Sequence, residues 1–210
     1  MTKIILARHG ETAWNVEKIY RGRTDVSLDE VGIKQAELLG KYLSNWEVEA
    51  IYSSPLKRAL DTANIIARYQ KIGVLIAEGL IDFDYGKWQS LSEQEVKRLY
   101  PTLYNEWHNN PHKVKMPGGE NLEDVRRRAI EVVNDVISKY QGNVVLISHR
   151  VVNKVLICSL LGLDNSHFWN IPQDVGGITI FNYVDGRFVL TSHNDTSHLS
   201  ELQKSLLEDF

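Results

Sequence analysis

Short apolar runs alternate along the chain with longer segments in which apolar residues recur every three or four positions. The short runs are rich in branched residues, and they predict buried strands. They lie at residues 3–7, 50–53, 74–77 and 144–147. The longer segments have the period of amphipathic helices. They lie at residues 28–46, 56–69, 122–140 and 151–161.

Local signals mark where several of these elements begin or turn. Ser27 with Glu30 forms a capping-box pattern, which predicts Ser27 as the N-cap of the first helix. Ser92 with Glu95 forms a second one inside a stretch rich in Trp, Pro and Gly, and predicts a short helix there. Near the C-terminus, Asp185-Gly186 separates apolar runs at residues 178–184 and 188–192, which indicates a β-hairpin.

The order of these elements predicts a three-layer α/β/α sandwich. Strands and helices alternate twice, an insert follows, and the alternation then resumes before the hairpin. We therefore expect a mostly parallel sheet with an antiparallel edge strand from the hairpin. A length of 210 residues suits a single domain spanning residues 1–210, with a helical insert at about 78–120 and a short C-terminal tail from residue 197.

Composition narrows the classes of function. The chain has 24 Lys and Arg against 27 Asp and Glu, a net charge of −3 that argues against broad binding of nucleic acid or acidic membranes. A single cysteine, Cys158, excludes an intramolecular disulfide and a cysteine-based zinc site. The first apolar run is too short for a signal peptide, and no apolar stretch approaches the length of a membrane span. We expect a cytoplasmic protein that binds neither nucleic acid nor membranes.

Polar and charged side chains gather at the predicted carboxyl ends of the strands, the edge where open α/β sheets bind ligands. In chain order these residues are Arg8 and His9, then Ser53, Ser54 and Arg58, then Asp82 and Asp84, and finally Ser148, His149 and Arg150. Each has a structural alternative when taken alone: a solvated loop start, a surface ion pair, an ordinary loop acid or a helix cap. Their joint placement favours a functional site.

Two histidines among several arginines suit a phosphate-like anion. Guanidinium groups bind phosphate oxygens in pairs, and a histidine can act as a nucleophile near neutral pH. The chain has no P-loop, no GxGxxG after a strand and no HExxH. His108 and His112 are four apart, but Pro111 between them opposes the helix that a shared metal would need. Neither a metal nor a cofactor is predicted.

Several motifs in a fixed order resemble those of the histidine phosphatase superfamily, also called the phosphoglycerate mutase-like family. They cover nearly the whole chain. They are Arg8-His9-Gly10-Glu11-Thr12 with Trp14-Asn15, Ser53-Ser54-Pro55-Leu56-Lys57-Arg58-Ala59 with Thr62-Ala63, Tyr85-Gly86-Lys87-Trp88, Pro117-Gly118-Gly119-Glu120, and Ser148-His149. The resemblance implies a phosphoglycerate mutase-like fold.

The resemblance also implies roles for individual residues. His9 would become phosphorylated, and Arg8, Arg58 and His149 would clamp the phosphoryl group. Asn15 would add a side-chain donor to this clamp. Asp82 stands four residues before Gly86, where the family's phosphatases usually carry Glu, and it would protonate the leaving group. Its rival Asp84 is one residue out of phase with that position.

The remaining candidate site residues, which would bind substrate, are Arg21, Gly22, Tyr85 and Arg150. Arg21 stands where many relatives carry Gln, and it adds positive charge at the substrate mouth. Arg150 stands where many relatives have Gly; its side chain could bind a substrate carboxylate or cap a helix. Tyr85 occupies a position where phosphoserine phosphatases of the family can carry His.

These features predict a metal-independent phosphatase that hydrolyses a small phosphorylated metabolite through a phosphohistidine intermediate. The insert resembles that of metal-independent phosphoserine phosphatases, and residues 194–199 resemble α-ribazole phosphatases; broad specificity is a third option. A cofactor-dependent phosphoglycerate mutase is the alternative enzyme, and a non-catalytic scaffold is the alternative of another class. The resemblance, together with aromatic residues of the insert expected at the surface, predicts a homodimer.

Overall fold

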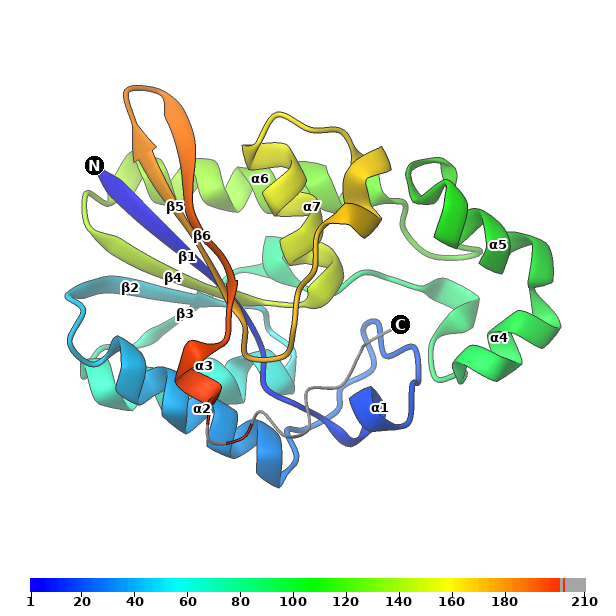
Figure 1. Cartoon of the computed structure of the whole chain (residues 1–210), viewed down its shortest axis with the longest axis horizontal. Helices are drawn as coiled ribbons and strands as arrows, with labels where there is room; N and C mark the ends of the chain where they lie inside the picture. The colour runs from blue at the N-terminus through cyan, green and yellow to red at the C-terminus, as the bar shows by residue number, and fades with distance from the viewer. Residues whose placement is uncertain (201, 203–210) are drawn as a thin grey trace.

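A six-stranded sheet runs through the middle of the molecule in the computed structural model, which describes residues 1–200 and 202 (Figure 1). Its strands are β1 (Thr2–Arg8), β2 (Val48–Ser53), β3 (Val74–Ile76), β4 (Asn143–Ser148), β5 (Ile178–Val184) and β6 (Arg187–Asp195). Their order across the sheet is β3-β2-β4-β1-β5-β6. The first four are mutually parallel, and β5 runs antiparallel to both β1 and β6. The mixed, largely parallel sheet matches the prediction.

Helices cover both faces of the sheet. They are α1 (Ala13–Val16), α2 (Glu30–Leu43), α3 (Lys57–Gln70), α4 (Glu93–Leu99), α5 (Pro101–Asn109), α6 (Leu122–Lys139) and α7 (Arg150–Leu160). Alternation along β1 separates two cores: Ile4 and Leu6 pack with α6 and α7, whereas Ile5 and Ala7 pack with α2 and α3. The three-layer α/β/α arrangement is therefore confirmed.

The insert at residues 78–120 contains α4 and α5, which extend to one side of the sheet in Figure 1. The expectation that its aromatic residues lie at the surface is wrong for its two tryptophans. Trp88 and Trp107 are 0% and 1% exposed, and Phe83 stacks on Trp107 with ring centroids 5.5 Å apart. These rings form a core under the insert, because burying large aromatic surfaces is what holds such a small helical unit in place.

One of the two capping boxes is confirmed and the other is wrong. Ser92 caps α4, and its hydroxyl accepts from the Glu95 amide. The first long helix is capped by Asp29 instead of Ser27, with the Asp29 carboxylate accepting from the Gly32 amide at 2.7 Å. A tertiary contact fixes this start, since the Asp29 amide donates to the Glu11 carbonyl oxygen. This helix also ends earlier than predicted, at Leu43.

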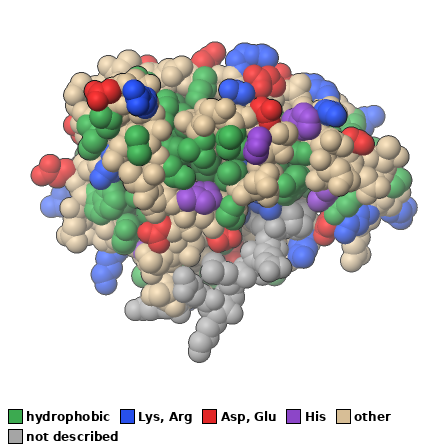
Figure 2. All heavy atoms as spheres, turned by 45° about the horizontal axis from the view of Figure 1, so that its top comes forward, with side chains coloured by type: hydrophobic (Ala, Val, Ile, Leu, Met, Phe, Trp, Pro, Cys, Tyr) green, Lys and Arg blue, Asp and Glu red, His purple; other side chains and the backbone are tan. Residues whose placement is uncertain are grey.

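The outer surface shows no dominant charge in the view of Figure 2, where acidic and basic side chains are interspersed. None of the helices within residues 1–200 and 202 is long and apolar enough to cross a membrane. Ser197–Leu199 of the predicted tail forms a 3₁₀ turn with Leu199 buried. The rest of that tail, apart from residues 200 and 202, lies outside the described residues.

Candidate active site

Three parallel strands end at the same edge of the sheet and bring their next residues together. The register pairs Arg8 with Ser148 across β1 and β4, and Ser53 with Ile147 across β2 and β4. The residue that follows β1, His9, therefore lies beside the residue that follows β4, His149. Their ring centroids are 5.1 Å apart.

His9 is held in one orientation by the backbone of the next residue, Gly10. It is 1% exposed, and its Nδ1 lies 2.6 Å from the Gly10 carbonyl oxygen. A carbonyl oxygen only accepts hydrogen bonds, so Nδ1 carries the proton and Nε2 keeps its lone pair in the neutral ring. Burial, followed by the positive charge of Arg58, lowers the pKa of His9 well below its usual value. His9 is therefore a neutral imidazole with a nucleophilic Nε2.

His149 lies at the N-cap of α7, fully buried beside His9. Its Nε2 is 2.7 Å from the Ser54 hydroxyl, and its Nδ1 is 3.6 Å from Oδ2 of Asp82. Burial, and then the charge of Arg58, lower its pKa as well. Its Nδ1 has no hydrogen-bond partner among the described residues, which leaves it able to meet a phosphoryl oxygen.

Two buried guanidinium groups complete the cluster, and backbone carbonyls hold both. Arg58 donates to the carbonyl oxygens of Thr24 and Gly22 at 3.0 and 2.8 Å. Arg8 donates to the Gln173 carbonyl oxygen at 2.7 Å. Burial lowers the pKa of Arg58, and the Asp82 carboxylate opposes this effect. Fixed guanidinium forks of this kind are preorganised for the oxygens of a phosphoryl group.

Asp82 belongs to the cluster and Asp84 does not. Asp82 is 6% exposed; its Oδ2 accepts from Arg58 at 2.8 Å and its Oδ1 accepts from the Phe83 amide at 2.8 Å. Asp84 accepts from the Gly86 amide at 2.8 Å and lies 3.7 Å from the Arg23 guanidinium. The structure thus brings the carboxylate favoured by the sequence motif, and not its rival, to Arg58 and His149.

Arg128 of α6 supports the loop that carries Asp82, a role that sequence reasoning missed. It donates to the carbonyl oxygens of Gly79, Ile81 and Asp82 at 2.8, 2.6 and 3.2 Å. Glu120 binds Arg128 at 2.9 Å and accepts from the Asp84 amide at 3.0 Å. The motif at residues 117–120 pointed to Glu120, whereas Arg128 was hidden by its place in an amphipathic helix.

Two further residues have positions that the motifs alone did not specify. Asn15 is buried in α1, and its Oδ1 accepts from both the amide and the hydroxyl of Thr12. Gln173 was missed, because it lies in a loop with no recognisable motif and contributes through its backbone. Its carbonyl oxygen fixes Arg8, so this loop is part of the site.

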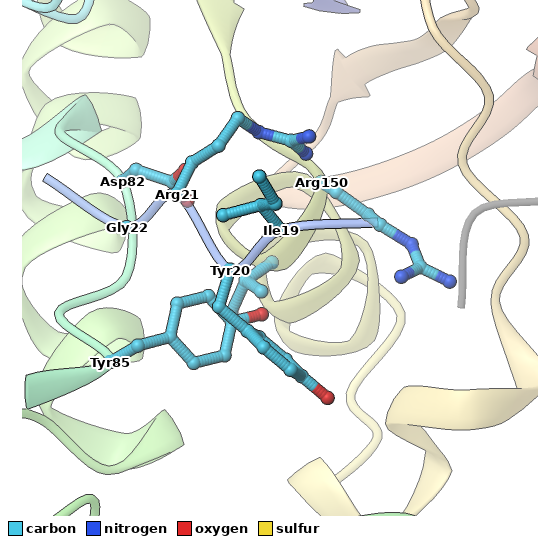
Figure 3. A pocket seen from close by; sticks show the side chains of 8 residues that line it. Ile19, Tyr20, Arg21, Gly22, Asp82, Tyr85 and Arg150 are labelled. Carbon is cyan, nitrogen blue, oxygen red and sulfur yellow. The ribbon is translucent and has the colours of Figure 1, made fainter. Parts of the chain in front are cut away.

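A pocket adjoins the buried cluster at Asp82 (Figure 3). It is lined by Ile19, Tyr20, Arg21, Gly22, Asp82, Tyr85, Arg150 and Val151. Four of the residues predicted to bind substrate, Arg21, Gly22, Tyr85 and Arg150, thus line one opening, and Asn15 does not. The Arg150 guanidinium lies 5.5 Å from the ring centroid of Trp169. Within the described residues, no three or more His, Cys, Asp or Glu side chains lie together in a way that could hold a metal ion.

Comparisons with known proteins give matches along most of the chain. The family model of the histidine phosphatase superfamily (branch 1) matches residues 4–196. Phosphoserine phosphatase 1 of Hydrogenobacter thermophilus is 38% identical over 202 residues, which cover 96% of each chain. A variant phosphoserine phosphatase of Entamoeba histolytica, solved in complex with phosphoserine, superposes with a TM-score of 0.84 at 31% identity, over 95% of this chain and 100% of that one. The α-ribazole phosphatase of Shigella flexneri has a TM-score of 0.84 at 25% identity, over 92% and 96% of the two chains.

Proposed function

The chain belongs to the histidine phosphatase superfamily and is a phosphatase, and from this premise we propose that it hydrolyses small phosphomonoesters through a phosphohistidine at His9, without a metal ion. One observation carries the proposal. The hydrogen bond from His9 Nδ1 to the Gly10 carbonyl oxygen leaves Nε2 as a lone-pair nucleophile inside a cluster of two arginines and a second histidine.

In the first step, His9 Nε2 attacks phosphorus and the ester P–O bond breaks. Arg8 and Arg58 neutralise the equatorial oxygens, and this charge is already in place before the reaction. His149 Nδ1 provides a further contact to the phosphoryl group. The negative charge of a bound phosphoryl dianion favours the protonated form of this imidazole in the complex.

Asp82 handles the protons. It donates its proton to the departing alkoxide in the first step, and it takes a proton from the water that attacks phospho-His9 in the second. Inorganic phosphate then leaves, and His9 returns to its starting form. The position of Asp82 supports this role, since it is the residue shared by the buried cluster and the open pocket.

The first test replaces the nucleophile. His9→Ala is expected to lower turnover to background while leaving the fold intact, because His9 follows the end of β1 and lies outside the two hydrophobic cores. Wild-type enzyme incubated with ³²P-labelled substrate and quenched in an alkaline denaturant should carry a base-stable, acid-labile label that the variant lacks. Retained turnover in His9→Ala with a folded circular-dichroism spectrum would refute the mechanism. Full activity of the wild type in excess EDTA checks the metal independence.

Phosphoserine and α-ribazole phosphate are the candidate substrates. Relatives with each activity resemble this chain along most of its length. The higher identity to the phosphoserine phosphatases supports phosphoserine first. Parallel assays with both esters, compared by kcat/KM, decide between them.

We also propose that the enzyme is a cytoplasmic homodimer. The exposed apolar residues Leu75 and Ile76 lie on β3, an edge strand, and they support a contact between two chains at that edge. The tryptophans of the insert are buried and do not support one. Light scattering at micromolar concentration should give twice the chain mass of 24.0 kDa for the wild type. The Ile76→Lys variant should give the mass of a single chain. A wild-type mass of one chain would refute the dimer.

A further inference from the structure

Ser54 contacts His149 where β2 and β4 end. It is the residue after β2, and its amide donates to the Ile147 carbonyl oxygen of β4 at 3.0 Å, so the pairing of the two strands continues to this point. Its side chain is fully buried, and the hydroxyl oxygen lies 2.7 Å from Nε2 of His149. The strand ends therefore hold a hydroxyl against one ring nitrogen, while the other ring nitrogen lies on the side of Asp82.

The Ser54 hydroxyl has one proton and two contacts, which fixes the direction of both hydrogen bonds. The Leu56 amide lies 3.3 Å from the hydroxyl oxygen, and an amide N–H can only donate. The hydroxyl proton then has a single acceptor among the described residues, which is Nε2 of His149. If Nε2 carried a proton instead, the oxygen would accept twice and the hydroxyl proton would be buried without a partner, which is unfavourable. The hydrogen bond therefore runs from Ser54 to Nε2.

A hydrogen bond in this direction determines which nitrogen of His149 carries the proton. When one nitrogen of a neutral imidazole accepts a hydrogen bond, the other nitrogen holds the N–H. Burial, and then the charge of Arg58, lower the pKa of His149 well below its usual value, so the ring of the free enzyme is neutral. The N–H therefore lies at Nδ1, 3.6 Å from Oδ2 of Asp82.

Resting on the proposed function, we propose that Ser54 is a positioning residue that keeps the proton of His149 on Nδ1, so that the site presents a preformed N–H donor to the phosphoryl group. The opposite tautomer would turn a lone pair toward the oxygens of a dianion and repel them. His9 and His149 then carry their protons on the same ring atom, fixed by Gly10 in one case and by Ser54 in the other. Their roles differ because His9 uses its bare Nε2 and His149 uses its Nδ1–H. A second proton taken up at Nε2 of His149 in the complex would leave this donor unchanged.

NMR of enzyme labelled with ¹⁵N-histidine measures the tautomer directly, because protonated and bare ring nitrogens differ widely in ¹⁵N chemical shift. The free enzyme is observed at pH 7.5 in a buffer without phosphate, and the His149 signals are those that His149→Gln lacks. We expect a protonated Nδ1 and a bare Nε2 in the wild type. In Ser54→Ala, Nε2 should carry a proton in a measurable fraction of the molecules. A wild-type enzyme with the proton on Nε2, or a Ser54→Ala variant with the wild-type tautomer, would refute the proposal.

Kinetics measure what this tautomer contributes to turnover. Ser54→Ala is expected to lower kcat/KM by about 10-fold, the range for one hydrogen bond, and Ser54→Thr, which keeps the hydroxyl, should recover most of the loss. The loss should be equal on phosphoserine and p-nitrophenyl phosphate, because His149 contacts the phosphoryl group that both share. Ser159→Ala is the matched control. It removes a hydroxyl of α7 that donates to the Val155 carbonyl oxygen, and it should keep wild-type activity.

The proposed function and the role of Ser54 fail separately. If the wild type hydrolyses no phosphate ester, the proposed function is refuted, and NMR of the free enzyme still decides the tautomer of His149. If the wild type is active but Ser54→Ala keeps its kcat/KM, the phosphatase stands and the role of Ser54 in turnover is refuted. If Ser54→Ala loses activity while His149 keeps the wild-type tautomer, Ser54 supports the fold of the site and does not set the proton.

Discussion

Asp82 shows how a short side chain can be brought to the place of the proposed proton donor. It is one methylene shorter than the glutamate that the family motif leads one to expect, yet its Oδ2 lies 2.8 Å from Arg58 and 3.6 Å from His149. The position of the backbone compensates for the shorter side chain of Asp82. Arg128 binds three carbonyl groups of the loop, those of Gly79, Ile81 and Asp82 itself, and so fixes the backbone that carries Asp82.

Asp82→Ala is expected to distinguish acid catalysis from a purely structural ion pair. An alkyl alkoxide needs a proton to leave and p-nitrophenolate does not, so the variant should lose about 10²–10⁴-fold on phosphoserine and far less on p-nitrophenyl phosphate. The measurement is kcat/KM on both substrates. Asp84→Asn is the matched control, because that carboxylate binds Gly86 and Arg23 instead of the cluster. Equal losses of Asp82→Ala on both substrates, or a leaving-group effect confined to Asp84→Asn, would reassign the acid.

Among the elements, those with a strong periodic pattern were predictable and those fixed by tertiary contacts were not. The strands before His9 and His149 follow from apolar runs alone, and the parallel order then brings both histidines to one edge. The cap at Asp29 depends on a contact with the Glu11 backbone, which no local pattern records. Arg128 and the Gln173 loop likewise act through backbone carbonyls far away in the sequence. Sequence motifs therefore identified the side chains proposed to take part in catalysis, and they did not identify Arg128 and Gln173, which position those side chains.

The loop that carries Asp82, here called the acid loop, ends in a turn at Gly86, which lies against Gly119. Gly86 has a φ of +53°, and a Cβ there would meet the Pro117 carbonyl oxygen and the Gly119 amide. Gly86→Ala is therefore expected to destabilise the fold by on the order of 1–3 kcal/mol for the overlap, in addition to the strain of the left-handed backbone, and to lower kcat by displacing Asp82. Urea unfolding and kcat on phosphoserine measure the two effects.

Gly118→Ala separates these two causes. Gly118 has a φ of +74°, but a Cβ there would meet nothing within 4 Å. It should show the backbone strain without the overlap, so its loss of stability should be the smaller one and its kcat should stay near wild type. Equal losses in the two variants would mean that the contact between residues 86 and 117–119 does not support the acid loop.

At the scale of the whole molecule, the two buried histidines are expected to lower the free energy of unfolding in acid. His9 and His149 lie fully buried among guanidinium groups, and both have a pKa well below the usual value because of burial first and Arg58 second. In the unfolded chain the same side chains titrate near the ordinary value of about 6.5. The unfolded state therefore binds more protons than the folded state wherever the pH lies between these two values.

The sign of the resulting pH dependence follows directly. The stabilisation that comes from keeping these histidines neutral is fully present above about pH 6.5, and it is lost as the pH falls from there toward the lowered pKa values, by up to about 1.4 kcal/mol per pH unit for each histidine. Urea unfolding between pH 7.5 and 5 measures the slope of the free energy of unfolding against pH. The buffers contain no phosphate, because a bound anion would stabilise the folded state.

His149→Gln keeps a polar group near the Ser54 hydroxyl and removes one titrating group, so its free energy of unfolding should fall less steeply than that of the wild type. His112→Gln, at an exposed position of the insert, should keep the wild-type slope. Parallel curves for the wild type and His149→Gln would show that His149 does not contribute to the loss of stability in acid.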